Sequence, residues 1–423
     1  MPHFVIIGNS AAAIGAIEGF RRIDSDSKIT LISDEPHHTY GRPLISYLLL
    51  GKTDRERMLY RPADFYEKNG VTAKLGARAT KIDAAAKTVA LDSGETVSYD
   101  KLLYGAGSSP FVPPMDGLED VKRKYTFQTL DSALALGEAL TEVGANARVL
   151  IIGAGLIGLK CAEGIREKCA SITFVDLADR VLPSILDAQA SDIIKSACEA
   201  EGLAFRLGTS VASFTENTAT LATGEKLEFD ILVLAVGVRP NTALLKDAGV
   251  KVERGVVIDE FSRTSNTDIY AAGDCCEQKD VVTGESRIMA VLPNAYMQGE
   301  AAGLNAAGVS VQFDKAFPLN AIGFFGKHVL SAGFYDGEET AIVEGNNYKK
   351  FFVRDNKLRG FILIGSKHPE DGEIPAYERA GIITDLIRRG TDLSTVDFKL
   401  LTQHPALAAF GQDVRREYLG EEH

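Results

Sequence analysis

The sequence predicts an α/β protein with two Rossmann-like units, followed by a C-terminal region of α+β character. The order strand, small-residue turn, helix and strand occurs twice, and an acidic residue follows the second strand each time. One such turn is weak support, whereas two turns that lie a domain's length apart are strong support. The chain length of 423 residues agrees, because it suggests about three domains.

The first unit has predicted strands at 4–7 and 28–33 and a predicted helix at 14–22. Its turn departs from the Gly-x-Gly-x-x-Gly fingerprint, since it reads Gly8-Asn9-Ser10-Ala11-Ala12-Ala13. Ser10 could donate a hydrogen bond to a phosphate, and Ala13 still permits close packing of the helix on the strand. Taken alone, this turn is also compatible with an ordinary α/β connection that binds nothing.

The second unit has predicted strands at 148–152 and 172–175 around a helix at 159–168. Its turn is a complete fingerprint, Gly153-Ala154-Gly155-Leu156-Ile157-Gly158. Glycines let the backbone approach a pyrophosphate, and the helix that follows offers free N–H groups and a partial positive charge. Asp176 ends the unit and could accept hydrogen bonds from a ribose. Because a carboxylate repels the 2′-phosphate of NADPH, the sequence favours NADH.

The composition narrows the class of protein. A net charge of −12 argues against nucleic acid as the main ligand. No run approaches the ~20 apolar residues of a membrane span, and the N-terminus starts a strand without a leader. The five cysteines show neither zinc spacing nor a Cys-x-x-Cys pair, and the histidines are scattered. These features predict a soluble cytoplasmic protein with reduced thiols and no metal site.

The rest of the chain is less distinctive. Strands are predicted at 87–91, 101–104 and 229–234, and the three prolines at 110, 113 and 114 mark a linker. Beyond Phe317, a β-hairpin is predicted at 348–354 and 358–364 around Asp355-Asn356-Lys357. A helix is predicted at 377–389, and the polar segment 403–423 is expected at the surface.

Several motifs in order resemble the two-dinucleotide-binding flavoprotein family, specifically its NADH:rubredoxin and ferredoxin reductase branch. The resemblance extends to flavoprotein subunits of anaerobic oxidoreductase complexes. It covers nearly the whole chain up to about Gly365. The matching segments are Tyr40-Gly41-Arg42-Pro43-Leu44-Ile45-Ser46, Tyr104-Gly105-Ala106-Gly107-Ser108-Ser109-Pro110, Ala235-Val236-Gly237-Val238-Arg239-Pro240-Asn241, Tyr270-Ala271-Ala272-Gly273-Asp274 and Pro293-Asn294-Ala295 through Gln298.

The resemblance implies two nested dinucleotide-binding domains: a discontinuous FAD-binding domain (1–112 and 244–316) around an NADH-binding domain (113–243). A C-terminal α+β interface domain (317–423) would follow. It implies FAD and NAD(H) as cofactors, with the flavin rather than a side chain carrying the chemistry. The implied FAD contacts are Gly8, Ser10, Ala11, Ala12, Asp34 or Glu35 at the ribose, Arg42, Pro43, Ser46, Ala79 at the adenine, Ala106, Gly107, Asp274 at the ribityl chain or phosphate, and Leu292 at the isoalloxazine. The implied NAD(H) contacts are Gly153, Gly155, Leu156, Ile157, Gly158, Asp176 and Gly237.

The chain departs from the family pattern at three places. Tyr47 stands where members often carry a lysine near the flavin, Lys160 stands where many carry a glutamate that contacts the nicotinamide, and the chain has no tryptophan. No cysteine precedes Cys161, so the disulfide mechanism of the superfamily is not expected. Cys275-Cys276 could lie near the cofactor, but a structural role is favoured.

The predicted function is electron transfer between NADH and an iron–sulfur or rubredoxin-like protein or subunit, in either direction. Homo- or hetero-oligomers are both compatible with this prediction. Two alternatives stay open: an NADH oxidase, and a non-enzymatic flavoprotein that responds to NADH.

Overall fold

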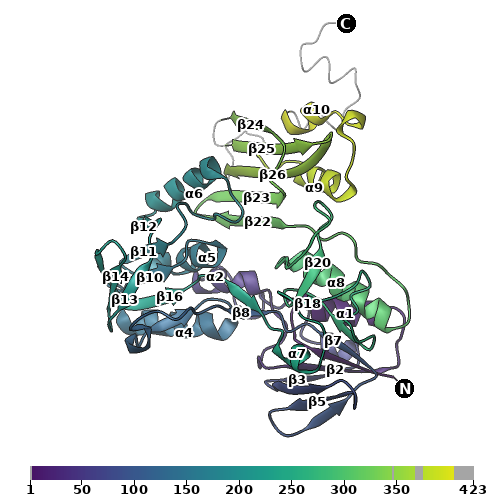
Figure 1. Ribbon diagram of the computed structural model, residues 1–423. Coiled ribbons are helices and arrows are strands. Elements are labelled where there is room, and N and C mark those ends of the chain that lie inside the picture. Colours follow the sequence, from purple (N-terminus) through teal and green to yellow (C-terminus); the bar gives the residue numbers. More distant parts are fainter. Residues whose placement is uncertain (1, 345–346, 367–374, 404–423) are drawn as a thin grey trace, which may run out of the picture. The chain divides into compact units, whose positions relative to one another are not determined.

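The computed structural model describes residues 2–344, 347–366 and 375–403. These residues form two compact units (Figure 1). The first unit holds the residues up to 184, together with 198–280 and 284–316. The second holds 185–197, 281–283 and the described residues from 317 onward. The α/β class predicted from the sequence is confirmed, because the first unit contains two parallel sheets and the second an antiparallel sheet.

The first parallel sheet has the strand order β3-β2-β1-β7-β19. The chain leaves this sheet after β7 and returns to it only at β19, so the residues of the second sheet are inserted between these two strands. Its strands are β1 (His3–Ile7), β2 (Lys28–Ser33), β3 (Val71–Leu75), β7 (Lys101–Tyr104) and β19 (Ile269–Ala271).

The second parallel sheet repeats this arrangement with the order β12-β11-β10-β16-β9. Apart from Arg148 at the start of β10, the strands β10 and β16 at its centre are apolar, as expected where helices cover both faces of a parallel sheet. Its strands are β9 (Lys124–Thr126), β10 (Arg148–Ile152), β11 (Ser171–Asp176), β12 (Leu203–Leu207) and β16 (Ile231–Leu234).

Helices follow the strands of both sheets (Figure 1). Helix α1 begins at Ala11, three residues before its predicted start, because the preceding turn is shorter than the apolar pattern indicated. α1 and α8 touch backbone to backbone: a Cβ atom at Gly299 of α8 would lie 2.0 Å from the carbonyl oxygen of Ala12. The helices are α1 (Ala11–Arg21), α2 (Ile45–Leu49), α3 (Phe65–Lys68), α4 (Leu130–Val143), α5 (Leu156–Ile165), α6 (Ala188–Ala200), α7 (Ala243–Asp247) and α8 (Leu292–Ala306).

Small antiparallel sheets complete the first unit. β8 (Ser108–Pro110) pairs with β17 (Val238–Pro240). The two strands lie in the two segments that connect one parallel sheet to the other, so their pairing joins these segments. The others are β4 (Ala79–Asp83) with β5 (Thr88–Leu91) and β6 (Thr96–Ser98), β13 (Val211–Phe214) with β14 (Thr218–Leu221) and β15 (Lys226–Glu228), and β18 (Val256–Val257) with β20 (Cys276–Lys279) and β21 (Ser286–Arg287).

The second unit is built on the sheet β22-β23-β26-β25-β24. The predicted hairpin is confirmed, and Asp355 and Asn356 both adopt the positive φ that its two-residue turn requires. The predicted helix at 377–389 begins only at Ala380, because Arg379 has a φ of +58°. The elements are β22 (Leu319–Phe324), β23 (Lys327–Gly333), β24 (Glu338–Glu344), β25 (Asn347–Arg354), β26 (Lys357–Ser366), α9 (Ala380–Arg389) and α10 (Phe398–Gln403).

Among the described residues, no helix has the length and apolar character that crossing a bilayer would require. The prediction that 403–423 lies at the surface falls outside the described residues, except for Gln403 at the end of α10.

Candidate functional site

The two glycine turns share their local geometry. Gly8 follows β1 and Gly153 follows β10, and both adopt a φ of +108°. A Cβ atom at Gly8 would lie 2.1 Å from the carbonyl oxygen of Gly105, and one at Gly153 would lie 2.4 Å from that of Ala235. Any side chain would therefore collide with the segment after the neighbouring strand, so both positions require glycine.

The N-termini of α1 and α5 are both suited to an anion. No side chain caps either helix, and neither has an acidic residue in its first turn. The N-cap residues are Ser10 and Gly155, and a Cβ atom at Gly155 would meet nothing within 4 Å. Free N–H groups and the positive end of the helix favour a phosphate here. The predicted residues Ala11, Ala12, Leu156, Ile157 and Gly158 all lie in these first turns.

Asp176 ends β11 beside the second turn. Its carboxylate accepts hydrogen bonds from the N–H groups of Ala154, at 2.6 Å, and Ala178, at 2.8 Å. The acid therefore holds the glycine turn in shape and places negative charge next to it. This arrangement suits a ribose with free hydroxyls and disfavours one that carries a phosphate.

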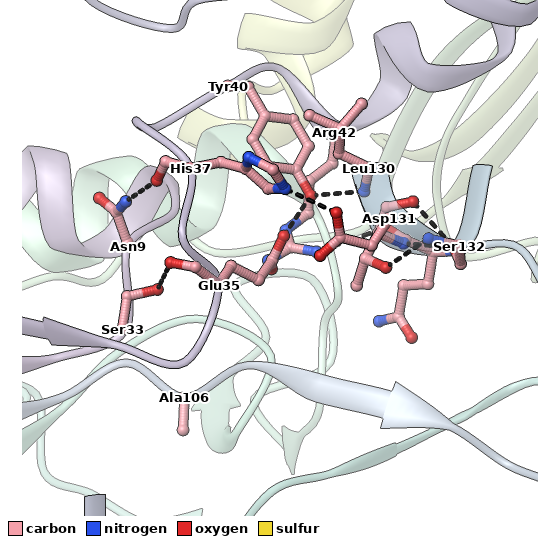
Figure 2. Close-up of polar contacts among 12 residues, drawn as sticks. Asn9, Ser33, Glu35, His37, Tyr40, Arg42, Ala106, Leu130, Asp131 and Ser132 are labelled. Carbon is pink, nitrogen blue, oxygen red and sulfur yellow. Dashed lines mark hydrogen bonds and ion pairs between the residues drawn. The ribbon is translucent and has the colours of Figure 1, made fainter. Parts of the chain in front are cut away.

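The loop after β2 turns Glu35 towards a cation. The Glu35 carboxylate accepts hydrogen bonds from the Tyr40 hydroxyl, at 2.6 Å, and from the Arg42 guanidinium (Figure 2). The guanidinium carbon of Arg42 lies 5.5 Å from the centre of the Tyr40 ring. Asp34, the other acid predicted for the ribose, is exposed.

The same loop is tied to the start of α4 (Figure 2). The Tyr40 hydroxyl accepts a hydrogen bond from the Leu130 N–H at 2.9 Å, and His37 Nε2 lies 2.7 Å from the Asp131 carboxylate. The loop that carries the candidate FAD residues is thus connected to a helix of the inserted second Rossmann-like unit.

Asp274 is a half-buried carboxylate that a ligand could satisfy. It lies just after β19, and the Ser108 hydroxyl donates a 3.4 Å hydrogen bond to its Oδ2. Burial raises the pKa of the Asp274 carboxyl, while Ser108 and the nearby Arg42 partly offset that rise. An acid that is partly shielded from water and accepts one long hydrogen bond is costly to ionise, and hydroxyl donors from a bound polyol would relieve that cost. The residues present therefore fit a flavin nucleotide.

Gln128 is a candidate site residue that the sequence motifs did not reveal. Its backbone oxygen accepts a hydrogen bond from Arg42 at 3.3 Å, and its Nε2 donates one to the Ser108 carbonyl oxygen at 2.9 Å. Its Oε1 is buried and has no hydrogen-bond partner among the described residues. Only the tertiary structure brings it here, because it belongs to none of the recognised motifs.

The remaining predicted residues lie around this centre or at its edge. Ala12 lies at the convergence of three segments, since Cβ atoms built at Gly105 and Gly273 would lie 3.7 and 3.5 Å from its Cβ. The two linking turns are joined by Asn241, whose side chain donates to the Ala106 oxygen and whose N–H donates to the Gly107 oxygen, both at 2.9 Å. Pro43 lies in the short turn Arg42–Leu44 before α2, Ser46 lies in α2, Ala79 begins β4, Gly237 precedes β17 and Leu292 begins α8.

All five cysteines are buried. Burial raises the pKa of the thiols of Cys161, Cys169, Cys198 and Cys276. Such thiols are poor nucleophiles, which agrees with the structural role favoured from the sequence. Among the described residues, no group of three or more His, Cys, Asp or Glu side chains is arranged to hold a metal ion.

We expect no thiol of the native protein to react with an aromatic disulfide reagent within minutes. In guanidinium chloride, all five thiols should react at once, because unfolding exposes these buried side chains to the reagent. Absorbance titration of released thiolate measures both counts. A native thiol that reacts in seconds would contradict this prediction and would reopen a redox role for that cysteine.

Known proteins that are similar to this chain are consistent with the fold and the candidate site described above. A sequence model of the pyridine nucleotide-disulphide oxidoreductases matches residues 2–299. The epsilon subunit of NADH-dependent phenylglyoxylate dehydrogenase from Aromatoleum evansii is 31% identical over 92% of each chain. Rubredoxin-NAD(+) reductase from Pseudomonas putida is 29% identical over 72% of this chain and 80% of its own. A solved complex of putidaredoxin reductase with putidaredoxin superposes with a TM-score of 0.84, at 23% identity, over 96% of this chain and 97% of the matched chain.

Proposed function

The chain belongs to the pyridine nucleotide-disulphide oxidoreductase family, whose members bind FAD and NAD(P)H, and we propose that it passes electrons between NADH and an iron–sulfur or rubredoxin-like protein. We propose further that it works as the flavin subunit of a larger redox complex. The observation that carries this second step is the similarity over 92% of both chains to a protein named as a subunit of an NADH-dependent dehydrogenase.

In this proposal, the first unit holds both cofactors. The first turn of α1 and Arg42 bind the FAD pyrophosphate, and Glu35 binds the ribose. Asp274 and Gln128 bind the ribityl chain and the cofactor groups next to it. FAD, when bound, accepts a hydride and can release electrons singly, so it converts two-electron into one-electron transfer. The side chains position the cofactor and exclude water.

The second glycine turn and Asp176 would bind the other dinucleotide. The turn meets the pyrophosphate through the first turn of α5, and Asp176 accepts hydrogen bonds from the adenosine ribose. Because Asp176 places a carboxylate beside the turn, we propose a preference for NADH over NADPH.

The buried thiols support a direct exit of electrons from the flavin. A disulfide mechanism needs a reactive cysteine beside the flavin, and the raised thiol pKa values disfavour one. A protein that accepts or donates single electrons can exchange them directly with the flavin, so no thiol is needed. The cytoplasmic location, the absence of nucleic acid as a partner and assembly into an oligomer stay predictions.

The test is anaerobic stopped-flow mixing of the purified protein with NADH or NADPH, followed at the flavin absorbance. We expect rapid bleaching with NADH, slower bleaching with NADPH, little oxygen consumption in a parallel aerobic assay, and co-purification of an iron–sulfur subunit from the native host. Sustained oxygen uptake would instead identify an oxidase. A slow, stable charge-transfer band without turnover would identify an NADH-responsive flavoprotein. A colourless protein that takes up no FAD would overturn the proposal.

A further inference from the structure

Helices α2 and α5 pack with their backbones close together and join the two Rossmann-like units, both of which belong to the first compact unit. α2 follows the Arg42–Pro43 segment of the first unit, and α5 is the helix that begins at the second glycine turn. A Cβ atom at Gly164 of α5 would lie 2.8 Å from the carbonyl oxygen of Ser46 in α2. A small displacement of either helix would therefore change the distance between the two candidate cofactor sites.

A charged cluster lies at this contact. Lys160 of α5 forms an ion pair with Glu163 one turn further along the same helix, and their side chains are only 11% and 14% exposed. The ammonium nitrogen of Lys160 lies 4.3 Å from the centre of the Tyr47 ring in α2. The cluster therefore combines a shielded ion pair within α5 with a cation–π contact across the two helices.

The spacing on α5 places this cluster close to the candidate dinucleotide site. Leu156, Lys160 and Gly164 are four residues apart, so they share one face of the helix. Leu156 belongs to the first turn, whose N–H groups face the proposed pyrophosphate, and Gly164 packs on α2. Lys160 lies between these two contacts.

We propose that Lys160, held between the Tyr47 ring and the Glu163 carboxylate, is a positioning residue that fixes α5 against α2 and thereby sets the approach of the nicotinamide to the flavin. This inference rests on the proposed function. Hydride transfer requires reacting atoms about 3–3.5 Å apart, and a misplacement of about 1 Å can cost 100-fold in rate. A residue that fixes the relative position of the two sites thus controls the rate of flavin reduction without touching the reacting atoms.

The test compares Lys160→Met and Tyr47→Leu with the matched control Tyr47→Phe, which keeps the aromatic face and removes only the hydroxyl. Each protein is loaded with FAD, and flavin reduction by NADH is followed under anaerobic conditions over a range of NADH concentrations. We expect the limiting rate to fall about 10- to 100-fold in Lys160→Met and Tyr47→Leu, with a smaller change in the dissociation constant for NADH. Tyr47→Phe should stay within about twofold of the wild type.

A second comparison separates positioning from stability. Lys160→Met leaves the Glu163 carboxylate without this cation, whereas the double variant Lys160→Met/Glu163→Gln removes both charges and should recover thermal stability but not the rate. Recovery of the rate along with the melting temperature would overturn the proposal, as would a limiting rate in Lys160→Met equal to that of the wild type. If NADH does not reduce the wild-type flavin at all, the proposed function is contradicted. If NADH reduces the wild type and the variants equally fast, only the inference about Lys160 is contradicted.

Discussion

The variant Gly153→Ala is expected to remain yellow and folded, with its flavin reduced by NADH at least 100-fold more slowly than in the wild type. The matched variant Gly8→Ala is expected to lose its flavin. Both glycines adopt a φ of +108°, and at both a Cβ atom would overlap a carbonyl oxygen of the neighbouring segment. The backbone strain alone costs about 1–3 kcal/mol, and relief of the overlap must displace the turn that faces the pyrophosphate.

The two variants distinguish the two sites because each glycine follows the central strand of a different parallel sheet. FAD content is measured from the ratio of flavin to protein absorbance, and NADH reactivity from anaerobic flavin reduction. Circular dichroism checks that each variant is folded. If Gly153→Ala lost FAD while Gly8→Ala kept it, the assignment of the cofactors to the two turns would be reversed. Wild-type behaviour in both variants would show that neither turn binds a dinucleotide.

The variant Asp274→Asn is expected to weaken FAD binding and, in the apoprotein, to raise the melting temperature. A hydrogen bond to a charged group contributes about 1.5–3 kcal/mol, so its loss should weaken FAD binding about 10- to 150-fold. The apoprotein gains stability because desolvation makes the ionised carboxylate costly, which is the same cause that raises the pKa of the Asp274 carboxyl. Changes of opposite sign in affinity and stability are typical of a residue kept for binding.

The pH dependence of this gain follows from the direction of the pKa shift. The folded pKa of Asp274 lies above its ordinary value, so the folded state holds the proton more tightly than the unfolded state. The stability of the wild-type apoprotein therefore falls as the pH rises from the ordinary carboxyl pKa through the raised one. The advantage of Asp274→Asn should be full above this window and absent below it.

Melting curves of the two apoproteins across the pH range measure this difference. Asp176→Asn provides the control, because the Asp176 carboxylate accepts two short backbone hydrogen bonds and its replacement should lower stability. An Asp274→Asn apoprotein that melts below the wild type at neutral pH would contradict the prediction.

Much of the fold and of the candidate site could be predicted from the sequence, because the relevant signals are local. A glycine at a tight turn, an apolar strand before it and an acid after the next strand lie within about 30 residues of one another. Three strands, at 28–33, 101–104 and 148–152, have the bounds that the apolar patterns predicted. Other bounds differ by a few residues, both at strand ends, as at Ile231, and at helix ends, as at Ala11 and Ala380. At the two helix ends, a neighbouring backbone conformation rather than hydrophobicity decides the first residue.

Contacts between distant segments could not be predicted in this way. Gln128 lies 86 residues from Arg42 and carries no motif, and the choice of Glu35 over Asp34 as the inward-facing acid depends on where Tyr40 and Arg42 lie. In the sequence, Tyr47 and Lys160 stand out only as departures from a family pattern. Their contact is visible only once α2 is packed on α5.

The sequence by itself determined that this chain has two small-residue turns of the dinucleotide-binding type and no cysteine ahead of the second one, since short-range backbone geometry and residue chemistry dictate both. The tertiary structure alone decided which side chains meet between those turns: a half-buried Asp274 with Ser108, Arg42 with Glu35, and Lys160 with Tyr47. The physical reason is that these pairs are brought together by the packing of whole helices and sheets, and residues far apart in sequence carry no local sign of it.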